Sequence, residues 1–255
     1  MNGFWCFTKK ELLENLRNFK MLILFGVFLV FGMMSPLLAK LTPLLLKSMN
    51  LEGFNLMIPE ATVIDSYAQL FKNLTQMGMI VLLLLFCGGA AQEISRGTAI
   101  LVLARGLSRS AFLLSKLAVQ ILLWTAAYVL SAAVCFGYTQ FLFPGASPAG
   151  LLFSLFCLWV FGIFALSVAA FWGVATKGSF APLLLTAATL GVLLILSVIP
   201  NAAIYLPTAL ASFNTDLLTG GTAPADLLPA LCIAGAASIG LAAVSVALFR
   251  KKQIG

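Results

Sequence analysis

Residues 21–39 read MLILFGVFLVFGMMSPLLA, a stretch without a single charge that lies between Lys20 and Lys40. An α-helix of about 20 apolar residues crosses the hydrocarbon core of a bilayer, which is roughly 30 Å thick. The stretch is longer than the apolar core of a cleaved signal peptide, which is about 7–15 residues, and no A-x-A site follows it. It is therefore predicted to be a membrane-spanning helix.

The composition of the whole chain supports the same conclusion. Of its 255 residues, 62% are hydrophobic and only 9% are charged, whereas a soluble domain carries roughly a quarter of charged residues. Such a chain lacks the polar side chains needed to cover a water-exposed surface. The predicted fold class is therefore all-α, a polytopic membrane protein in a bilayer.

Further charge-poor stretches give the number of spans. The Pro- and Gly-rich stretch FPGASPAG at 143–150 predicts a turn that divides a long apolar run into two helices, and Pro200 ends another. We predict one transmembrane domain over 1–255 with six spans, at about 21–39, 74–91, 117–141, 151–176, 180–199 and 227–249.

The distribution of Lys and Arg predicts the orientation, because cytoplasmic loops collect these residues. With the N-terminus inside, the inner segments hold twelve bases, which include Lys177 and Lys252, and three carboxylates. The outer segments, 41–72 with the adjoining Lys40 and 200–226, hold three bases and five carboxylates, and Glu52 is one of these carboxylates. Both termini are therefore expected in the cytoplasm, and the net charge of +7 requires no nucleic-acid partner.

Before the first span, residues 4–19 are predicted to form an amphipathic helix along the inner membrane interface. Trp5, Leu12, Leu16 and Phe19 fall on one helical face, and Lys9, Lys10, Glu14 and Arg17 fall elsewhere. A solvated leader is the alternative.

Most catalytic chemistry is missing from the sequence. No ionisable residue is central in any predicted span, although ion-coupled carriers and proton relays usually place one there. The chain has no His, no C-x-x-C among its five Cys residues and no phosphate-binding loop, so we expect no catalytic site, no metal site and no bound cofactor. The uncharged spans argue against a strongly charged solute at mid-membrane and favour an amphipathic or lipid-like one.

The most charged internal stretch is QEISRGTAILVLARGLSRSAFLLSK, residues 92–116. Gly106 is predicted to end a short helix, and Ser108 or Ser110 to cap the third span. A simple loop between two spans does not need an ordered helix with a defined C-terminal end. A connection that transmits movement from a cytoplasmic protein to the membrane helices would need one.

These residues are similar to a known family. Glu93, Gly97–Thr98, the leucine-rich ILVLAR, Ser108–Arg109 and Lys116 resemble the E…GT…LL…P-x-S-R…K signature of type-2 ABC exporter permeases. The stretches at 11–40 and 57–73 also resemble that family's leader, first span and outer segment. The resemblance covers about 1–120, and Gly106 stands where the family often has Pro.

The resemblance implies a type V exporter-like fold, with six spans per subunit and two subunits forming the path. It implies that a separate ATPase subunit, carrying ATP and Mg, docks on the leader and on a coupling helix at 92–110. The residues at or near that contact would be Glu93, Arg96, Gly97, Thr98, Arg105 and Arg109. The alternative for Arg109 and Lys116 is that they only anchor the loop to anionic lipid.

Three further segments carry weaker expectations. Gln120, Trp124, Tyr128 and Ser131 form a semi-polar stripe on the third span, which either lines a path or packs against a neighbouring helix. In the last span, Ala236 and Gly240 are expected to allow close helix packing within the subunit. Residues 200–226 are expected to form a re-entrant or loop segment on the outside.

The sequence therefore predicts the permease subunit of an ATP-driven exporter in a bacterial-type plasma membrane. It would pair with a second permease copy or a related permease, and it would not be an enzyme by itself. The alternative is a non-transporting membrane scaffold or assembly factor.

Overall fold

The computed structural model describes residues 2–48, 60–143, 145, 148–176, 178, 180–199 and 202–251. The side chains of Asn2 and of residues 46–48 are excepted. Lys177, Lys252, Glu52 and Pro200, which entered the sequence predictions, lie outside this part of the chain. Within it, the regular structure is helical and no strand occurs, so the predicted all-α class is confirmed.

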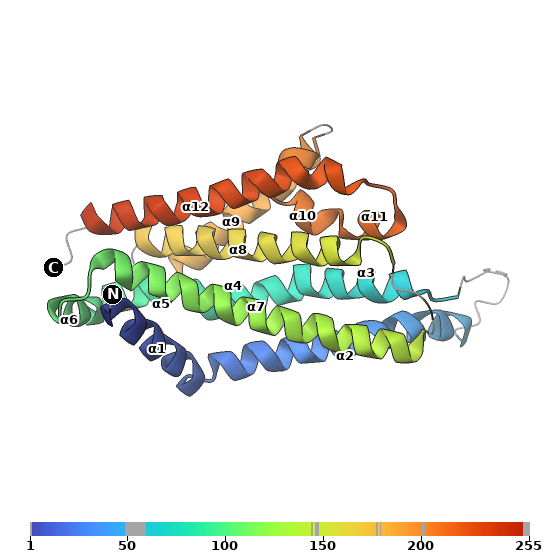
Figure 1. The fold of residues 1–255 in the computed structure, drawn as a ribbon, viewed down its shortest axis with the longest axis horizontal. Coiled ribbons are helices and arrows are strands. Elements are labelled where there is room, and N and C mark those ends of the chain that lie inside the picture. Colours follow the sequence, from blue (N-terminus) through green and yellow to red (C-terminus); the bar gives the residue numbers. More distant parts are fainter. Residues whose placement is uncertain are drawn as a thin grey trace.

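In the described part of the chain, five helical segments are long and apolar enough to cross a membrane (Figure 1): Lys20–Leu45, Val63–Ser95, Arg109–Leu142, Leu151–Ala175 and Pro224–Lys251. Their lengths and compositions are those expected of a multi-pass membrane protein. The fifth predicted span, 180–199, corresponds to the apolar helix α9 (Ala181–Leu196), which has 16 residues and is not among the five long segments. At 1.5 Å per residue it is about 24 Å long, shorter than a typical hydrocarbon core.

The N-terminal helix α1 (Asn2–Arg17) joins the first long helix α2 (Lys20–Ser48) through a sharp turn. Phe19 makes that turn with a positive φ of 56°. Trp5, Leu16 and Phe19, from the predicted apolar face, are exposed, whereas Phe7 and Glu11 are buried against the bundle. The segment is thus a helix with an apolar surface directed away from the protein and a second face packed on it.

The second membrane-crossing segment begins well before its predicted start. It runs through α3 (Val63–Asn73), a π-helical turn η1 (Leu74–Gly78), α4 (Met79–Phe86) and α5 (Gly89–Ser95). Thr62 and Asp65 form a capping box at the N-terminus of α3, which lets a polar helical turn extend the apolar stretch. The sequence prediction of 74–91 is shorter because the charges of Lys72 and Glu93 set its limits.

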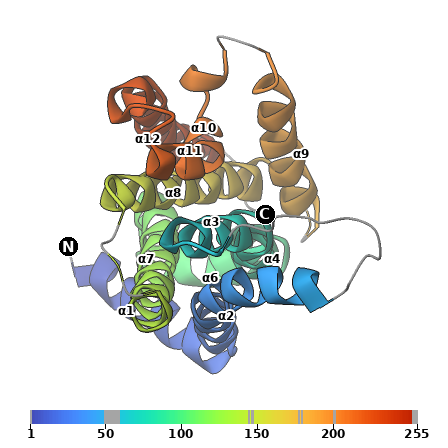
Figure 2. The same ribbon diagram turned by 90° about the vertical axis from the view of Figure 1, so that its right-hand side faces the viewer.

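The third and fourth spans lie close to their predicted positions, and the fourth is the most buried of the long apolar segments in the described chain. Helix α7 (Arg109–Leu142) begins two turns before the predicted residue 117, and α8 (Leu151–Ala175) ends one residue before the prediction. Helix α8 packs against α7, α9 and the last long helix, α12 (Leu228–Lys251), as the end-on view in Figure 2 shows. The main apolar core lies between these helices, α2 and the α3–α4 segment.

Residues 202–227 fold back against the bundle as short helical turns. They comprise η2 (Ala203–Tyr205), α10 (Ala209–Ser212), α11 (Asn214–Thr219) and η3 (Pro224–Leu227). Leu210 and Leu217 are buried, and α10 and α11 pack against α8. The segment is therefore packed against the protein and is not an extended loop.

One expected packing contact is wrong. Ala236 and Gly240 of α12 are exposed, and a Cβ added at Gly240 would meet no atom within 4 Å. The small residues that α12 buries are instead Ala230, Ala234, Ser238 and Ser245.

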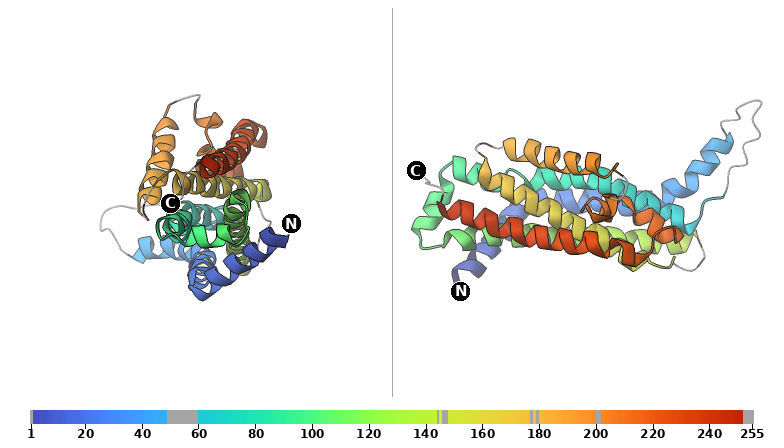
Figure 3. Two further views of the ribbon diagram at one scale, coloured as in Figure 1. Left: turned by 90° about the vertical axis from the view of Figure 1, so that its left-hand side faces the viewer. Right: turned by 90° about the horizontal axis from the view of Figure 1, so that it is seen from above.

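The start of α1, the last turn of α12 and the segment from α5 to α6 lie at one end of the bundle (Figures 1 and 3). We call this the terminal end. It consists of α1, α5, α6 (Thr98–Ala104), the first turns of α7 and the last turn of α12. Helix α1 leaves the bundle axis at this end, as the right-hand view of Figure 3 shows.

Candidate functional site: a charge cluster at the terminal end

The segment predicted as one coupling helix at 92–110 consists of two short helices. Helix α5 ends at Ser95, and Gly97 follows with a φ of 72°, a left-handed conformation that glycine adopts without a steric penalty. Helix α6 then ends before Gly106, whose φ is 90°. Ser108 caps α7 by accepting a hydrogen bond from the amide of Ala111 at 3.2 Å. The predicted glycine stop and serine cap are both confirmed.

The central feature of this end is a buried lysine. The Lys116 ammonium donates to both carboxylate oxygens of Glu11 at 2.9 Å and to Oε1 of Glu93 at 2.7 Å. The three residues come from α7, α1 and α5, and Lys116 is only 6% exposed. We call Glu11, Glu93 and Lys116 the carboxylate–lysine cluster. It joins three helices that are far apart in the sequence.

Aromatic residues enclose the same ammonium group. Its nitrogen lies 5.8 Å from the ring centroid of Phe7 and 5.2 Å from that of Phe112. Phe7 contacts Phe112, which in turn stacks on Phe249 of α12 with centroids 5.5 Å apart. Cation–π attraction adds to the ion pairs where water is excluded. The aromatic residues belong to a second apolar core that is separate from the main one.

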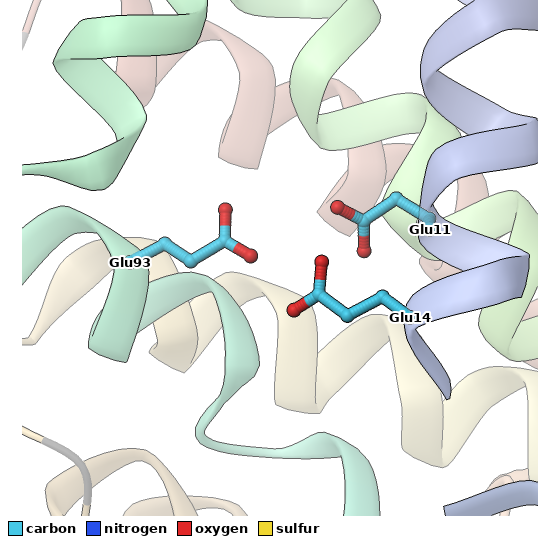
Figure 4. Close-up of side chains that lie close together, drawn as sticks. All are labelled: Glu11, Glu14 and Glu93. Atoms are coloured by element: carbon cyan, nitrogen blue, oxygen red, sulfur yellow. The ribbon is translucent and has the colours of Figure 1, made fainter. Parts of the chain in front are cut away.

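A third carboxylate stands beside the cluster. The carboxylate groups of Glu11, Glu14 and Glu93 point toward one another, two from α1 and one from α5 (Figure 4). One oxygen of each lies within 4.8 Å of the others. Lys10 forms ion pairs with Glu14 and, at 3.1 Å, with Glu11. Lys10 and Lys116 together therefore contact all three carboxylates.

The pKa values on α1 follow these contacts. Burial of the Glu14 carboxyl disfavours its charge, but the hydrogen bond from Lys10 and the charges of Lys10 and Lys116 outweigh burial, so its pKa is lowered. Burial likewise opposes the charge of Lys10, but the hydrogen bond to Glu14 and the nearby carboxylates raise its pKa. Both groups are therefore held in their charged forms.

A polar cavity of about 420 Å³ opens next to the cluster. It lies between α1, the start of α2, the α5–α6 segment and α7. Its ionisable lining residues are Lys10, Glu11, Glu14, Lys20, Glu93, Arg96 and Lys116. This is a volume typical of small-molecule sites, which occupy about 300–1,000 Å³.

The structure separates the six residues assigned to an ATPase contact. Glu93 is half-buried in the cluster, and Arg96 is exposed at the cavity. Gly97 makes the break between α5 and α6, and the Thr98 hydroxyl donates to the backbone carbonyl of Glu93 at 3.2 Å. Arg105 is exposed near the start of α1. They share the terminal end of the molecule but differ in burial and in local role.

Arg109 has a structural partner at the same end. Its guanidinium donates to the carbonyl of Phe249 at 3.2 Å and to that of Arg250 at 2.8 Å. These carbonyls lie in the last turn of α12, where helices leave carbonyl groups without internal partners. Arg109 therefore fastens the start of α7 to the end of α12.

Burial decides against one sequence-based alternative. A lysine that anchors a loop to anionic lipid must reach the headgroups, and Lys116 is enclosed by protein. The lipid-anchor interpretation is therefore wrong for Lys116. The place of Glu11 in the cluster was not predicted from the sequence, because Glu11 was counted only among the charges of the segments expected in the cytoplasm. The sequence feature that places Glu11 beside Phe7 is their spacing of four residues, which puts both on the same helical face.

The stripe on α7 lies against neighbouring helices. The Trp124 indole donates to the carbonyl of Trp159 at 3.1 Å, and the Tyr128 hydroxyl donates to that of Leu155 at 2.8 Å, both on α8. Ser131 is buried beside Gly32 of α2. Gln120 is half-buried, contacts the carbonyl of Phe86 at 3.5 Å and borders the polar cavity. Trp124, Tyr128 and Ser131 therefore contribute to helix packing.

Comparison with known proteins gives one match. The model of a family described as "Protein of unknown function (DUF2705)" matches residues 37–199, well over half of the chain. The match runs from the C-terminal part of α2 to α9 and includes Glu93 and Lys116. No curated protein and no solved structure matches.

Proposed function

We propose that this chain, which belongs to the family described as "Protein of unknown function (DUF2705)", is the permease subunit of an ATP-driven ABC exporter. The chain would form the substrate path through the membrane. A separate ATPase subunit would bind ATP and Mg at its own site and move the permease between inward- and outward-facing states.

The observation that carries the proposal is the carboxylate–lysine cluster. The resemblance to type-2 exporter permeases assigns the ATPase contact to the leader helix and to the segment around Glu93. In the structure, Lys116 binds Glu11 of α1 and Glu93 of α5 at once. Two segments that would receive the ATPase are thus held as one mechanical unit at the start of the long helix α7.

The packing of the terminal end supports the same proposal. Phe112 and Phe249 place α7 and α12 in the second apolar core, together with Phe7 of α1. A displacement of α5 or α6 would therefore be passed to several membrane-crossing helices, because packed interiors transmit strain. A loop that only connects two spans has no need of such coupling.

The finer architecture is part of the proposal. We infer a sixth span that contains α9. Because α9 is shorter than a typical span, either the residues that flank it also lie in the membrane or the bilayer around it is locally thinner. The terminal end would face the cytoplasm of a bacterial-type plasma membrane, following the excess of Lys and Arg. A second permease subunit, identical or related, would complete the path. The uncharged spans favour an amphipathic or lipid-like substrate.

Reconstitution tests the proposal. The chain would be purified from its own cells with any ABC ATPase that accompanies it, and the complex and the isolated chain would be placed in liposomes. We expect no ATP hydrolysis by the isolated chain, and ATP-dependent movement of labelled lipid-like solutes by the complex. If an ATPase never accompanies the chain, or if the complex hydrolyses ATP without moving any solute, the scaffold function is favoured instead.

A further inference from the structure

The polar cavity at the terminal end carries an excess of positive charge. Four bases line it, Lys10, Lys20, Arg96 and Lys116, against the three carboxylates of Glu11, Glu14 and Glu93. The side chains that line this cavity of about 420 Å³ thus carry one net positive charge. A buried or half-buried site with an uncompensated cation favours an anion of one charge.

The ion pairs show which bases are left over. Lys10 and Lys116 together contact all three carboxylates. In the described part of the chain, neither Lys20 nor Arg96 has a carboxylate within 4.0 Å. Lys20 is half-buried at the start of α2, and Arg96 lies at the end of α5. Two cations from different helices therefore border one cavity without a direct ion pair, and the lining as a whole has one positive charge more than its carboxylates balance.

The surroundings identify the kind of molecule that carries the anion. Lys20 is the first residue of α2, and the following Leu22 is 66% exposed. Leu16 and Phe19, just before it, are also exposed. A charged cavity next to exposed apolar side chains at the end of a membrane-crossing helix lies at the depth of lipid headgroups. A soluble anion would make no use of the adjoining apolar surface.

We propose that this cavity binds the phosphodiester group of an anionic phospholipid with one net negative charge, and that Lys20 and Arg96 are its charged partners. The amide of Asn18, which also lines the cavity, is placed to donate to a phosphate oxygen. The acyl chains would run over the exposed side chains at the start of α2. This lipid site does not depend on the proposed transport function.

Site-specific variants test the proposal. Lys20→Gln, Arg96→Gln and the double variant would be compared with wild type by native mass spectrometry, using phosphatidylglycerol in detergent micelles. Since neither base has an ion-pair partner in the described chain, the variants should fold and show the wild-type thermal unfolding. We expect each single variant to weaken lipid binding and the double variant to weaken it by at least about tenfold. Lys20→Arg, which keeps the charge, should bind as wild type does.

Matched controls separate this site from general attraction to anionic lipid. The variant Lys9→Gln/Arg250→Gln also loses two exposed bases at the same end, but neither lines the cavity, so it should retain lipid binding. Phosphatidylethanolamine and inorganic phosphate serve as further probes. Equal loss in the control, equal binding of phosphatidylethanolamine, or displacement of the lipid by millimolar phosphate would each overturn the proposal.

Discussion

At the scale of single residues, Lys116 decides how α1 is held. Its ammonium satisfies two carboxylates in a site that water hardly reaches. Taking three charges out of water is costly, and their mutual contacts offset that cost only while all three are present. The cluster therefore fixes the positions of α1, α5 and α7 relative to one another and adds little net stability.

Removing one charge should therefore be worse than removing all of them. We expect Lys116→Met to destabilise the terminal end by up to about 3–5 kcal/mol, because the half-buried Glu93 would lose its ion pair and the buried Glu11 would keep only its contact with Lys10. The triple variant Glu11→Gln/Glu93→Gln/Lys116→Met should regain most of that loss. Trypsin cleavage at Arg17, which is exposed between α1 and α2, reports the release of α1 in detergent.

One result would directly contradict the prediction for Lys116. If the single and triple variants are cleaved at the same rate as wild type, the ion pairs do not hold α1 in place.

At the scale of elements, close helix contacts depend on small residues. A Cβ added at Gly162 of α8 would lie 2.3 Å from the Trp124 ring of α7, and one at Gly32 of α2 would lie 2.6 Å from the Ser131 carbonyl. The stripe on α7 is thus placed between two glycines. This contact could not be foreseen, because nothing in the local sequence relates Gly162 to Trp124.

Gly162→Ala should force α7 and α8 apart. Overpacking of this kind costs about 1–3 kcal/mol, since the large, fully buried indole has little room to move. Gly240→Ala is the matched control, because its added Cβ meets nothing within 4 Å, and it should be neutral or slightly stabilising. Unfolding by SDS titration in mixed micelles measures both, and equal stability of the two variants would contradict the packing described for α7.

Much of the helix pattern could be predicted from the sequence. Charge-free stretches locate the long helices because a bilayer demands about 20 apolar residues. Local rules place the glycine stop at Gly106 and the cap at Ser108 or Ser110, and the structure selects Ser108. The ends of α3 and α7 were misplaced, because Asp65 and Lys116 were treated as charges outside a span. The Asp65 side chain caps the N-terminus of α3, and the Lys116 ammonium is paired with buried carboxylates.

The candidate site was predictable only in part. The resemblance singled out Glu93 and Lys116 one by one, but no sequence rule pairs residues from α1, α5 and α7. Glu11 in particular looks like any charge on an amphipathic helix. Only the packing of Phe7 on Phe112 brings its carboxylate to Lys116.

At the scale of the whole molecule, orientation in the membrane is an open prediction with a simple test. In a background without native Cys, Arg105→Cys at the terminal end and Ala225→Cys at the opposite end are exposed positions. We expect an impermeant maleimide to label position 225 in intact cells and position 105 only in inverted vesicles. Labelling of position 105 in intact cells would reverse the topology and place the proposed ATPase contact on the wrong side.

The central claim is that the terminal end receives an ATPase and that Glu93 helps to organise that contact. The most direct measurement is the amount of ABC ATPase that copurifies with tagged chains carrying Glu93→Ala or Arg250→Ala, together with the transport-linked rate of ATP hydrolysis. Glu93→Ala leaves Lys116 with one carboxylate fewer, a loss of about 2–5 kcal/mol for a buried pair, and should sharply reduce recovery of the ATPase or uncouple its hydrolysis from transport. Arg250→Ala, which removes an exposed base at the same end, should leave both unchanged. Wild-type recovery and wild-type coupled hydrolysis in Glu93→Ala would contradict the account.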